Sequence, residues 1–383
     1  MRKTTDFVSR ETPLTTQVAL FDELMLGFCD ATSLRPTMTI PRPLIYALLC
    51  AGTVANADPR TDLPSNSFSH KDWEIACDNT RMCRAAGYHP DDDTPNASIL
   101  LTRAAGPDQP VTVQLQLADD ERRPTPEHVA MSIDGRAMGS IRINVKSNSG
   151  TLSDAQAKAL LPALLNDSRI AWTADGTAWT VSTAGANAVL LKMDEFQGRL
   201  DTPGALARKG NKPESNVLPP LAPPEIKAGA VTPDRAPIKL TPAQTRDLAA
   251  ALRSTIKDGS CDLLDVKTDE AGKVEVHRLT KDKLLVSHAC WMAAYNSGDG
   301  YWVTNALPPY APVLVTTSAT DYDNGVISST QKGRGIGDCF SLATWTWDGR
   351  TFVQTSATTT GMCRQTAAGG AWDLPTLVTR VSK

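Results

Sequence analysis

The chain has 383 residues, eight cysteines and a formal charge of −3, from 39 lysines and arginines against 42 aspartates and glutamates. With 41% hydrophobic and 21% charged residues, it has the composition of a soluble globular protein, which argues against a disordered chain and against an integral membrane protein. A pI near 6.0 argues against a large face for polyanions, so we expect no nucleic acid among its partners. The length is too great for one compact core and predicts two domains with further segments outside them.

The N-terminal region has the layout of a secretory signal peptide. After Met38 the sequence has a basic residue, Arg42, and an apolar run over residues 44–54. The small-x-small site Ala55-Asn56-Ala57 then precedes Asp58. This order of features is typical of a leader that is cleaved after Ala57.

Two alternatives to the leader remain open, a buried core helix and a lipoprotein acylated at Cys50. Leu49 disfavours the lipoprotein, because a small residue normally precedes the acylated cysteine. Since the export machinery reads an N-terminus, we interpret residues 38–57 as the signal peptide and residues 1–37 as a mis-annotated upstream extension. The mature protein is expected to be periplasmic, with no transmembrane segment, because no other apolar stretch approaches the roughly 18 residues that a span needs.

The cysteines that remain after cleavage fit an exported protein. Their number is even, which predicts disulfides in an oxidising compartment. Cys77 and Cys83 stand alone in the N-terminal half, and Cys339 and Cys363 flank a predicted hairpin. This leaves Cys261 and Cys290 to pair with each other. A zinc site is the alternative, but neither C-x-x-C nor H-x-x-x-H spacing is present. The expected pairs are Cys77–Cys83, Cys261–Cys290 and Cys339–Cys363.

Nine prolines between residues 203 and 242 mark a joint in the mature chain. Proline fixes φ and lacks a backbone donor, so residues 203–242 are expected to form an extended linker without a helix or a central strand. This linker divides the chain into an N-terminal domain over residues 58–202 and a C-terminal domain over residues 243–383.

The N-terminal domain is predicted to consist mainly of antiparallel strands. Strict alternation over Val111–Leu117 predicts one buried and one solvated face. Ser153 is a helix cap, and Asp175-Gly176 is a hairpin turn. The expected strands are residues 73–77, 98–101, 111–117, 129–133, 141–145, 170–172 and 179–182, and the expected helices are residues 155–165 and 185–197.

The C-terminal domain begins with a predicted helix. Thr241 caps it, Pro242 takes its first position and Gly259 ends it. Asp323-Asn324-Gly325 and Asp348-Gly349 are hairpin turns. The expected strands are residues 274–279, 284–288, 301–305, 313–316, 345–347 and 351–353. The fold class is therefore α+β, with two mostly antiparallel-β domains that each carry one or two helices and are disulfide-bonded.

The mature chain contains five distinctive motifs: Trp73-Glu-Ile-Ala-Cys77-Asp-Asn-Thr-Arg-Met-Cys83-Arg-Ala-Ala-Gly87, Ala293-Ala-Tyr-Asn296, Lys332-Gly-Arg-Gly-Ile-Gly-Asp-Cys339, Trp345-Thr-Trp-Asp-Gly349 and Cys363-Arg364. Through these motifs the chain resembles a family of exported proteobacterial proteins of unknown function, and the match spans essentially the whole mature chain. The N-terminal half has an early tryptophan, two nearby cysteines, strands, and a helix after Ser182-Thr-Ala-Gly185, and through these features it is also more loosely similar to invasion-associated locus B proteins. The resemblance implies a periplasmic protein with no established reaction, and it supplies no catalytic residues.

The residues themselves give no catalytic constellation. There is no G-x-S-x-G elbow, and the five histidines are scattered without a fixed partner. Asp321-Tyr-Asp323-Asn-Gly325 starts like a calcium loop, but its glycine stands one position early and Lys332 replaces the bidentate glutamate. We therefore expect no cofactor, no metal ion and no recognisable catalytic residue.

A glycine-rich loop and a group of tryptophans are the candidates for a binding surface. The loop 332–338 lacks a Gly-Lys-Ser/Thr ending and precedes a strand, so a phosphate loop is not expected. It is either a tight strand connection or a loop that presents Arg334 to an anion. The tryptophans either form a core or are platforms for sugar rings or a partner protein. The candidate ligand surface is Arg334, Asp338, Trp302, Trp345 and Trp347.

The sequence therefore predicts a non-enzymatic periplasmic binding or envelope-interaction protein of unknown ligand, whose partner is a periplasmic protein or a glycan. The alternative is a cell-wall or glycan hydrolase with an unrecognised active site.

Overall fold

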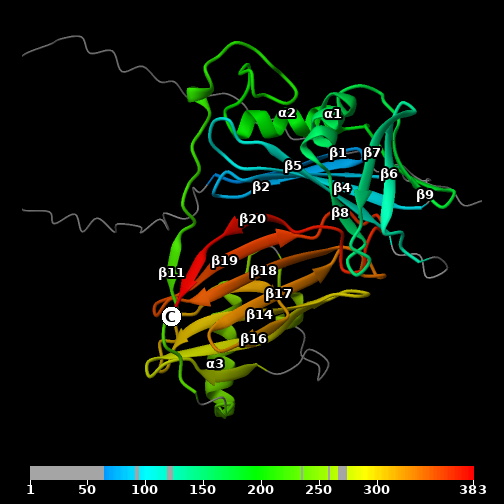
Figure 1. The fold of residues 1–383 in the computed structure, drawn as a ribbon. Helices are drawn as coiled ribbons and strands as arrows, with labels where there is room; N and C mark the ends of the chain where they lie inside the picture. The colour runs from blue at the N-terminus through cyan, green and yellow to red at the C-terminus, as the bar shows by residue number, and fades with distance from the viewer. Residues whose placement is uncertain (1–63, 91–94, 119–123, 234–235, 258, 266–273) are drawn as a thin grey trace, which may run out of the picture. The chain divides into compact units, whose positions relative to one another are not determined.

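The computed structural model describes residues 64–90, 95–118, 124–233, 236–257, 259–265 and 274–383 (Figure 1). All of them belong to one compact unit, Asp58–Lys383. The predicted upstream extension and signal peptide lie outside the described residues. Within those residues, no helix combines the length and the apolar character that crossing a bilayer requires.

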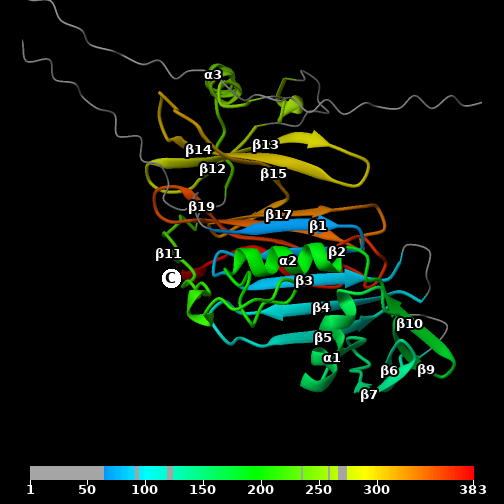
Figure 2. The same ribbon diagram turned by 90° about the horizontal axis from the view of Figure 1, so that it is seen from above.

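An antiparallel six-stranded sheet forms the centre of the N-terminal half. Its strand order is β1-β2-β3-β4-β5-β8, so that neighbours in the sheet are mostly neighbours in sequence. The helix α2 (Ala186–Phe196) packs on β1, β2 and β3, as Figure 2 shows. The strands are β1 (Asn66–His70), β2 (Trp73–Cys77), β3 (Cys83–Tyr88), β4 (Ala97–Arg103), β5 (Val111–Leu117) and β8 (Ser149–Thr151).

A second sheet completes the N-terminal half, in the order β10-β9-β6-β7. The helix α1 (Asp154–Leu164) starts as predicted at Ser153, whose side chain forms a capping box with Gln156. A single apolar core joins both sheets and both helices. The strands are β6 (His128–Ile133), β7 (Arg136–Arg142), β9 (Ile170–Ala174) and β10 (Thr177–Val181).

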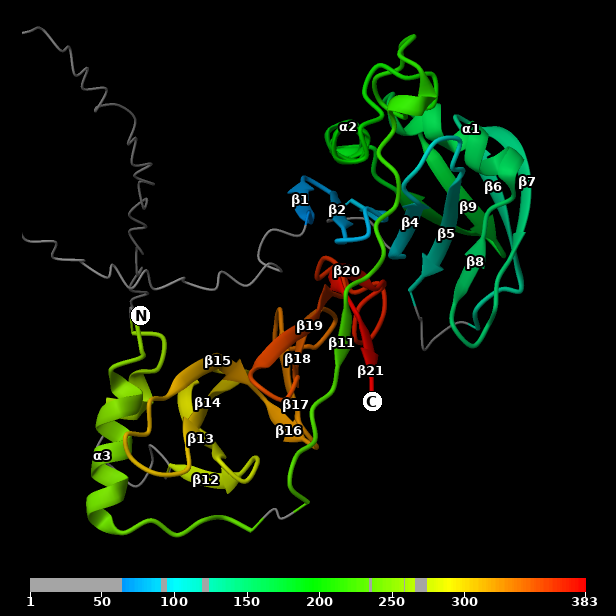
Figure 3. The ribbon, with the colours of Figure 1, turned by 90° about the vertical axis from the view of Figure 1, so that its left-hand side faces the viewer.

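The C-terminal half contains two further antiparallel sheets, in the orders β12-β13-β14-β15 and β16-β17-β18-β19-β20. The helix α3 (Pro242–Arg253) covers one face of the first sheet, where Leu248 and Leu252 share a core with Trp302 (Figure 3). The other face packs against the second sheet around Trp347. The strands are β12 (Glu275–Arg278), β13 (Lys283–Met292), β14 (Ser297–Asn305), β15 (Val313–Ala319), β16 (Asp321–Asp323), β17 (Val326–Lys332), β18 (Phe340–Trp347), β19 (Phe352–Thr359) and β20 (Leu374–Val378).

The proline-rich segment is extended only in part, and its beginning departs from the predicted extended linker, because residues 201–212 include turns and bends held by hydrogen bonds such as that from Gly210 N to Thr202 O. A 3-10 turn forms at Glu214–Asn216, and a strand, β11 (Glu225–Lys227), pairs in parallel with β21 (Arg380–Ser382), as Figure 3 shows. The pairing is continued by hydrogen bonds from Arg380 N to Pro224 O and from Ala228 N to Ser382 O. The segment therefore follows the C-terminal half through a two-stranded edge, which is the position in a sheet that neighbouring prolines permit.

Two predicted elements have different bounds in the structure. The predicted strand 141–145 is displaced, because Asp134 and Gly135 adopt positive φ and form a tight turn that starts β7 at Arg136. The predicted helix over residues 241–259 ends at Arg253, where Ser254 is the C-cap. The remaining predicted strands and helices have structural counterparts within a few residues, and the α+β, mostly antiparallel class is confirmed.

All three predicted disulfides are formed, namely Cys77–Cys83, Cys261–Cys290 and Cys339–Cys363. The first joins the paired ends of β2 and β3, where the two cysteines are direct cross-strand neighbours. Each bridge of this kind contributes about 2–4 kcal/mol by constraining the unfolded chain, and a short loop contributes less.

Candidate functional site

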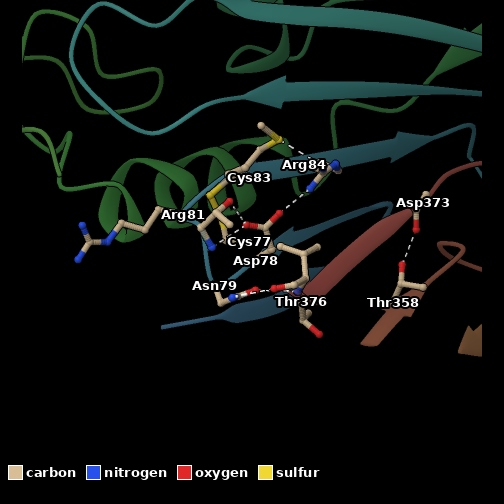
Figure 4. A network of polar contacts seen from close by, with 12 residues as sticks. Cys77, Asp78, Asn79, Arg81, Cys83, Arg84, Thr358, Asp373 and Thr376 are labelled. Carbon is tan, nitrogen blue, oxygen red and sulfur yellow. Dashed lines mark hydrogen bonds and ion pairs between the residues drawn. A yellow bond between two sulfur atoms is a disulfide. The ribbon is translucent and has the colours of Figure 1, made fainter. Parts of the chain in front are cut away.

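The residues of the N-terminal motif lie where the two halves of the chain meet. Asn79 binds the backbone of Val378 in both directions, with Nδ2 donating to the carbonyl over 3.0 Å and Oδ1 accepting from the N–H over 2.7 Å (Figure 4). Asp78 accepts hydrogen bonds from Thr80 and Arg84, which fixes the turn between Cys77 and Cys83. The turn therefore acts as an extra pairing partner for Val378, the last residue of β20.

A half-buried carboxylate completes this junction. Glu74 on β2 accepts hydrogen bonds from the hydroxyl of Tyr88 and the backbone N–H of Met362, each over 2.6 Å. Burial raises the pKa of Glu74, and burial followed by the charge of Glu74 raises the pKa of Tyr88 well above its usual value. A salt bridge of 2.9 Å joins Arg364 to Asp72 nearby. We conclude that Glu74, Arg364 and their neighbours hold the halves together.

Apolar residues from both halves pack around these polar contacts. Ala76, Ala86, Tyr88 and Leu100 of the six-stranded sheet form one buried cluster with Leu374 of β20. The indole of Trp372 packs beside this cluster and donates a hydrogen bond of 2.7 Å to Ser98 on β4. Of these residues, Ala76 and Ala86 belong to the N-terminal motif quoted for the family resemblance, and the others lie outside the quoted motifs.

The glycine-rich loop is held by an ion pair at its base. Arg334 donates to both carboxylate oxygens of Asp338, from Nε over 2.8 Å and from Nη2 over 2.5 Å. Asp338 also accepts the backbone N–H of Gln365 over 2.7 Å. The hydrogen bond and charge of Arg334 lower the pKa of Asp338 and raise that of Arg334 in return. The structure therefore brings together Arg334 and Asp338, two residues of the predicted ligand surface.

Steric crowding by the disulfide explains why position 333 is a glycine. A Cβ there would lie 2.5 Å from Cys339 Sγ and 2.8 Å from Cys363 Sγ, so only glycine lets the loop pass over the disulfide. The backbone N–H of Gly333 also donates to Cys339 O over 2.8 Å. The loop is therefore closely fitted to the disulfide beneath it.

A hairpin tip lies against this loop. Asn296, in the turn between β13 and β14, exchanges two hydrogen bonds of 2.9 Å with the backbone of Lys332. Tyr295 reaches the same loop, since a Cβ on Gly335 would lie 3.6 Å from its ring. The hairpin and the loop thus form one continuous surface.

Large apolar side chains are exposed on this surface. Met292 is 77%, Tyr295 47% and Ile336 65% exposed, and the side chain of Arg334 is 39% exposed. We call these four residues the hairpin–loop surface. Sequence reasoning found Arg334 but missed the other three, because no periodic pattern in a strand–turn–strand segment distinguishes an exposed methionine or isoleucine from a core residue.

Two of the three tryptophans in the predicted ligand surface are buried. Trp302 is 0% and Trp347 1% exposed. Trp302 Nε1 donates to Thr255 Oγ1 over 2.8 Å, and Trp347 packs on Phe352 with ring centroids 5.4 Å apart. Trp345 is half-buried against the same cluster as Trp347. The rings of Trp302 and Trp347 are therefore core residues in this structure and do not lie beside Arg334 on its surface.

Asp338 lies next to the sulfurs of Cys339 and Cys363, all within 4.8 Å of one another. These atoms do not fit a metal ion, because both sulfurs are in a disulfide and the carboxylate is bound by Arg334. The calcium-like stretch forms the turn of the β16–β17 hairpin, with positive φ at Asn324 and Gly325, as its turn interpretation predicted.

Comparisons with known proteins place the chain among relatives of unknown function. A family model described as "Protein of unknown function (DUF1176)" matches residues 67–379. The chain is 25% identical over 331 residues to the Escherichia coli (strain K12) protein described as uncharacterized protein YpfG, in a match that covers 80% of this chain and 90% of that protein. No solved structure matches the chain. Because the family model extends over both halves and the segment between them, the chain belongs to the DUF1176 family of proteins of unknown function.

Proposed function

We propose that this protein is an exported, periplasmic binding protein that docks a partner protein of the cell envelope through the hairpin–loop surface and catalyses no reaction. Two features support export. The residues before Asp58 have the layout of a signal peptide, and all six cysteines from Cys77 to Cys363 are paired in disulfides, as is usual in oxidising compartments.

The observation that carries the proposal is the exposure of Met292, Tyr295 and Ile336 on two segments that contact each other. Apolar side chains gathered on a surface mark interaction sites more often than single exposed residues do. Tyrosine and arginine are also the residue types that contribute most at interfaces, and Arg334 stands within this group.

The surface is ordered before any partner arrives. Asp338 fixes Arg334, Asn296 fixes Lys332, and the Cys339–Cys363 disulfide lies under Gly333. Docking then immobilises few side chains, which lowers the entropic cost of association.

The chemistry of the surface favours a protein over a glycan. Sugar rings stack on flat aromatic faces, but two of the three candidate tryptophans, Trp302 and Trp347, lie in cores. Met292 and Ile336 are flexible or branched aliphatic side chains that suit apolar pockets of a protein. Arg334, with its charge balanced by Asp338, suits the rim of such an interface, where it directs orientation.

Capture from a periplasmic extract tests the proposal. Immobilised wild-type protein should retain a defined partner, and Tyr295→Ala or Ile336→Ser should retain at least tenfold less of it. Leu307→Ser is the matched control, because Leu307 is 77% exposed on a separate loop, as exposed as Met292.

Equal loss of the partner in Leu307→Ser and Ile336→Ser would contradict the proposed surface. A hydrolase, the alternative function, would release soluble fragments from purified peptidoglycan or another envelope glycan, and we expect no such release.

A further inference from the structure

A pocket of about 250 Å³ opens between the two sheets of the C-terminal half. One wall is the face of β12, β13 and β14 on which Glu275, Ser287 and Tyr301 are successive cross-strand neighbours. The β16–β17 hairpin forms the other wall and supplies Asp321 and Tyr322. None of the lining residues belongs to the hairpin–loop surface, so this pocket is a separate feature of the molecule.

Two tyrosine rings from opposite sheets meet in this pocket. The ring centroids of Tyr301 and Tyr322 lie 6.2 Å apart, with their planes inclined by 38°. Tyr322 also rests edge-on against Phe352, at 6.3 Å and 75°, which fixes its orientation. Leu285 adds an apolar side chain to the floor. The pocket therefore combines π faces with an apolar base, a setting in which a cation is attracted to the rings.

Carboxylates surround these rings. Glu275 and Asp321 line the pocket, and Asp299 lies two residues before Tyr301 on the same face of β14. Burial, followed by the negative charges of Asp299, Asp321 and Glu275, raises the pKa of Tyr301 to about 12. Burial and the charge of Glu275 also raise the pKa of Asp299. These carboxylates make the pocket electrostatically negative around the Tyr301 hydroxyl.

The positive groups that line the pocket are His277 and Arg278. His277 Nε2 lies 3.7 Å from a carboxylate oxygen of Glu275. Arg278 donates from Nη1 to the backbone carbonyl of Lys281, which draws that nitrogen toward the β12–β13 turn. Two lining carboxylates, Glu275 and Asp321, therefore stand against one guanidinium and one imidazole, and Asp299, which His288 partly offsets, adds negative charge beside Tyr301.

We infer that this pocket binds a small organic cation, with its ammonium charge beside Glu275 and Asp321 and its alkyl groups against the rings of Tyr301 and Tyr322. An anion would be repelled by the carboxylates. A metal ion prefers a closed shell of oxygen ligands, which two ring faces and a leucine do not supply. The volume lies just below the range for drug-sized ligands, so the ligand is a compact molecule of about the size of choline.

Titration calorimetry of the purified, disulfide-bonded protein tests this inference with choline chloride as the probe, at constant ionic strength. The neutral compound 3,3-dimethylbutan-1-ol has the same shape without the charge. We expect saturable binding of choline at one site per chain and at least tenfold weaker binding of the neutral compound. The double variant Glu275→Gln/Asp321→Asn should weaken choline binding about tenfold, because both exposed carboxylates face the charge.

Asp282→Asn is the matched control, since Asp282 is an exposed carboxylate in the turn before β13 and does not line the pocket. It should leave the affinity for choline unchanged. The inference is overturned if choline shows no saturable binding, if the neutral compound binds as well as choline, or if the double variant keeps full affinity. Both substituted carboxylates are exposed, so the variants are expected to fold and the test remains informative.

Discussion

Met362 donates its backbone N–H to Oε1 of Glu74 over 2.6 Å, across 288 residues of sequence. The same carboxylate oxygen accepts the hydroxyl of Tyr88, and the N–H of Met362 also lies 3.0 Å from that hydroxyl. One side chain on β2 thus connects the six-stranded sheet of the N-terminal half to the segment that precedes Cys363. This contact ties the junction of the halves to the disulfide beneath the glycine-rich loop.

Glu74→Gln should change how stability depends on pH. Burial raises the pKa of Glu74 in the folded protein above its ordinary value of 4.5. Below pH 4.5 the carboxyl of Glu74 is protonated in both the folded and the unfolded state, so its burial does not lower the free energy of unfolding. As the pH rises from 4.5 through the folded pKa, the unfolded state ionises first, so the free energy of unfolding falls, and the loss is complete above the folded pKa.

Glutamine cannot ionise, so wild type should lose stability relative to Glu74→Gln as the pH rises through this window. Urea denaturation between about pH 4 and pH 8 measures the difference. Glu225→Gln is the control, because Glu225 is a largely exposed glutamate paired with Arg380. If the free energy of unfolding of wild type instead rises relative to that of Glu74→Gln as the pH increases, the predicted direction of the pKa shift of Glu74 is wrong.

Arg334→Ala and Asp338→Ala should have unequal effects on stability. Arg334 is partly exposed, so its loss should cost under about 1 kcal/mol and leave the melting temperature within a few degrees. Asp338 is nearly buried, and its loss leaves the N–H of Gln365 without its acceptor, which should cost about 1–3 kcal/mol.

Thermal and urea unfolding measure both variants, and capture of the partner should be weaker for Arg334→Ala in spite of its stability. Since Arg334 lowers the pKa of Asp338, the stability that this carboxylate contributes is present above its ordinary pKa of 3.8 and is lost as the pH falls through the folded value. Equal costs for the two variants would indicate that the contact with Gln365 contributes nothing.

Trp302→Ala should unfold at much lower denaturant concentration. Its ring is fully buried on the face of β14 that α3 covers, and its Nε1–H binds Thr255, so truncation should cost about 3–5 kcal/mol. Capture at low temperature should be retained by the fraction that folds. A variant such as Trp302→Phe that stays stable but loses capture would instead place this ring in the binding surface.

The secreted protein should begin at Asp58. The small residues Ala55 and Ala57 precede the predicted cleavage site, so intact-mass spectrometry of protein from the periplasmic fraction should give the mass of residues 58–383 less six hydrogen atoms for three disulfides. A chain that starts at Met1 or Met38, or that carries lipid on Cys50, would contradict the proposed processing.

Local features of the sequence predicted most of the elements. Ser153 and Thr241 are helix caps with a glutamine three residues on, and Asp175-Gly176 is a hairpin turn, so each signal acts within a few residues. The pairing of the cysteines followed from their order along the chain. These predictions succeeded because the interactions that decide them are close in sequence.

The junction and the exposed surface were not predictable in the same way. Glu74 meets Met362 and Asn79 meets Val378 only because two sheets pack together. No local sequence pattern around any of these residues indicates its distant partner. Ile336 and Trp302 both stand in segments rich in glycine or aromatic residues, yet one is exposed and the other is buried. Trp302 is buried because α3 covers its face of the first sheet, and that is a property of the assembled fold.

Site-specific photo-crosslinking tests the central claim most directly. A benzophenone amino acid at position 336 of the exported protein places the reactive group on the hairpin–loop surface, and the same substitution at position 307 provides the matched exposed control. The proposal predicts a discrete crosslinked adduct with one envelope protein from position 336, reduced by Tyr295→Ala, and none from position 307. The same adducts from both positions, or no adduct from position 336 in living cells, would contradict a docking role for this surface.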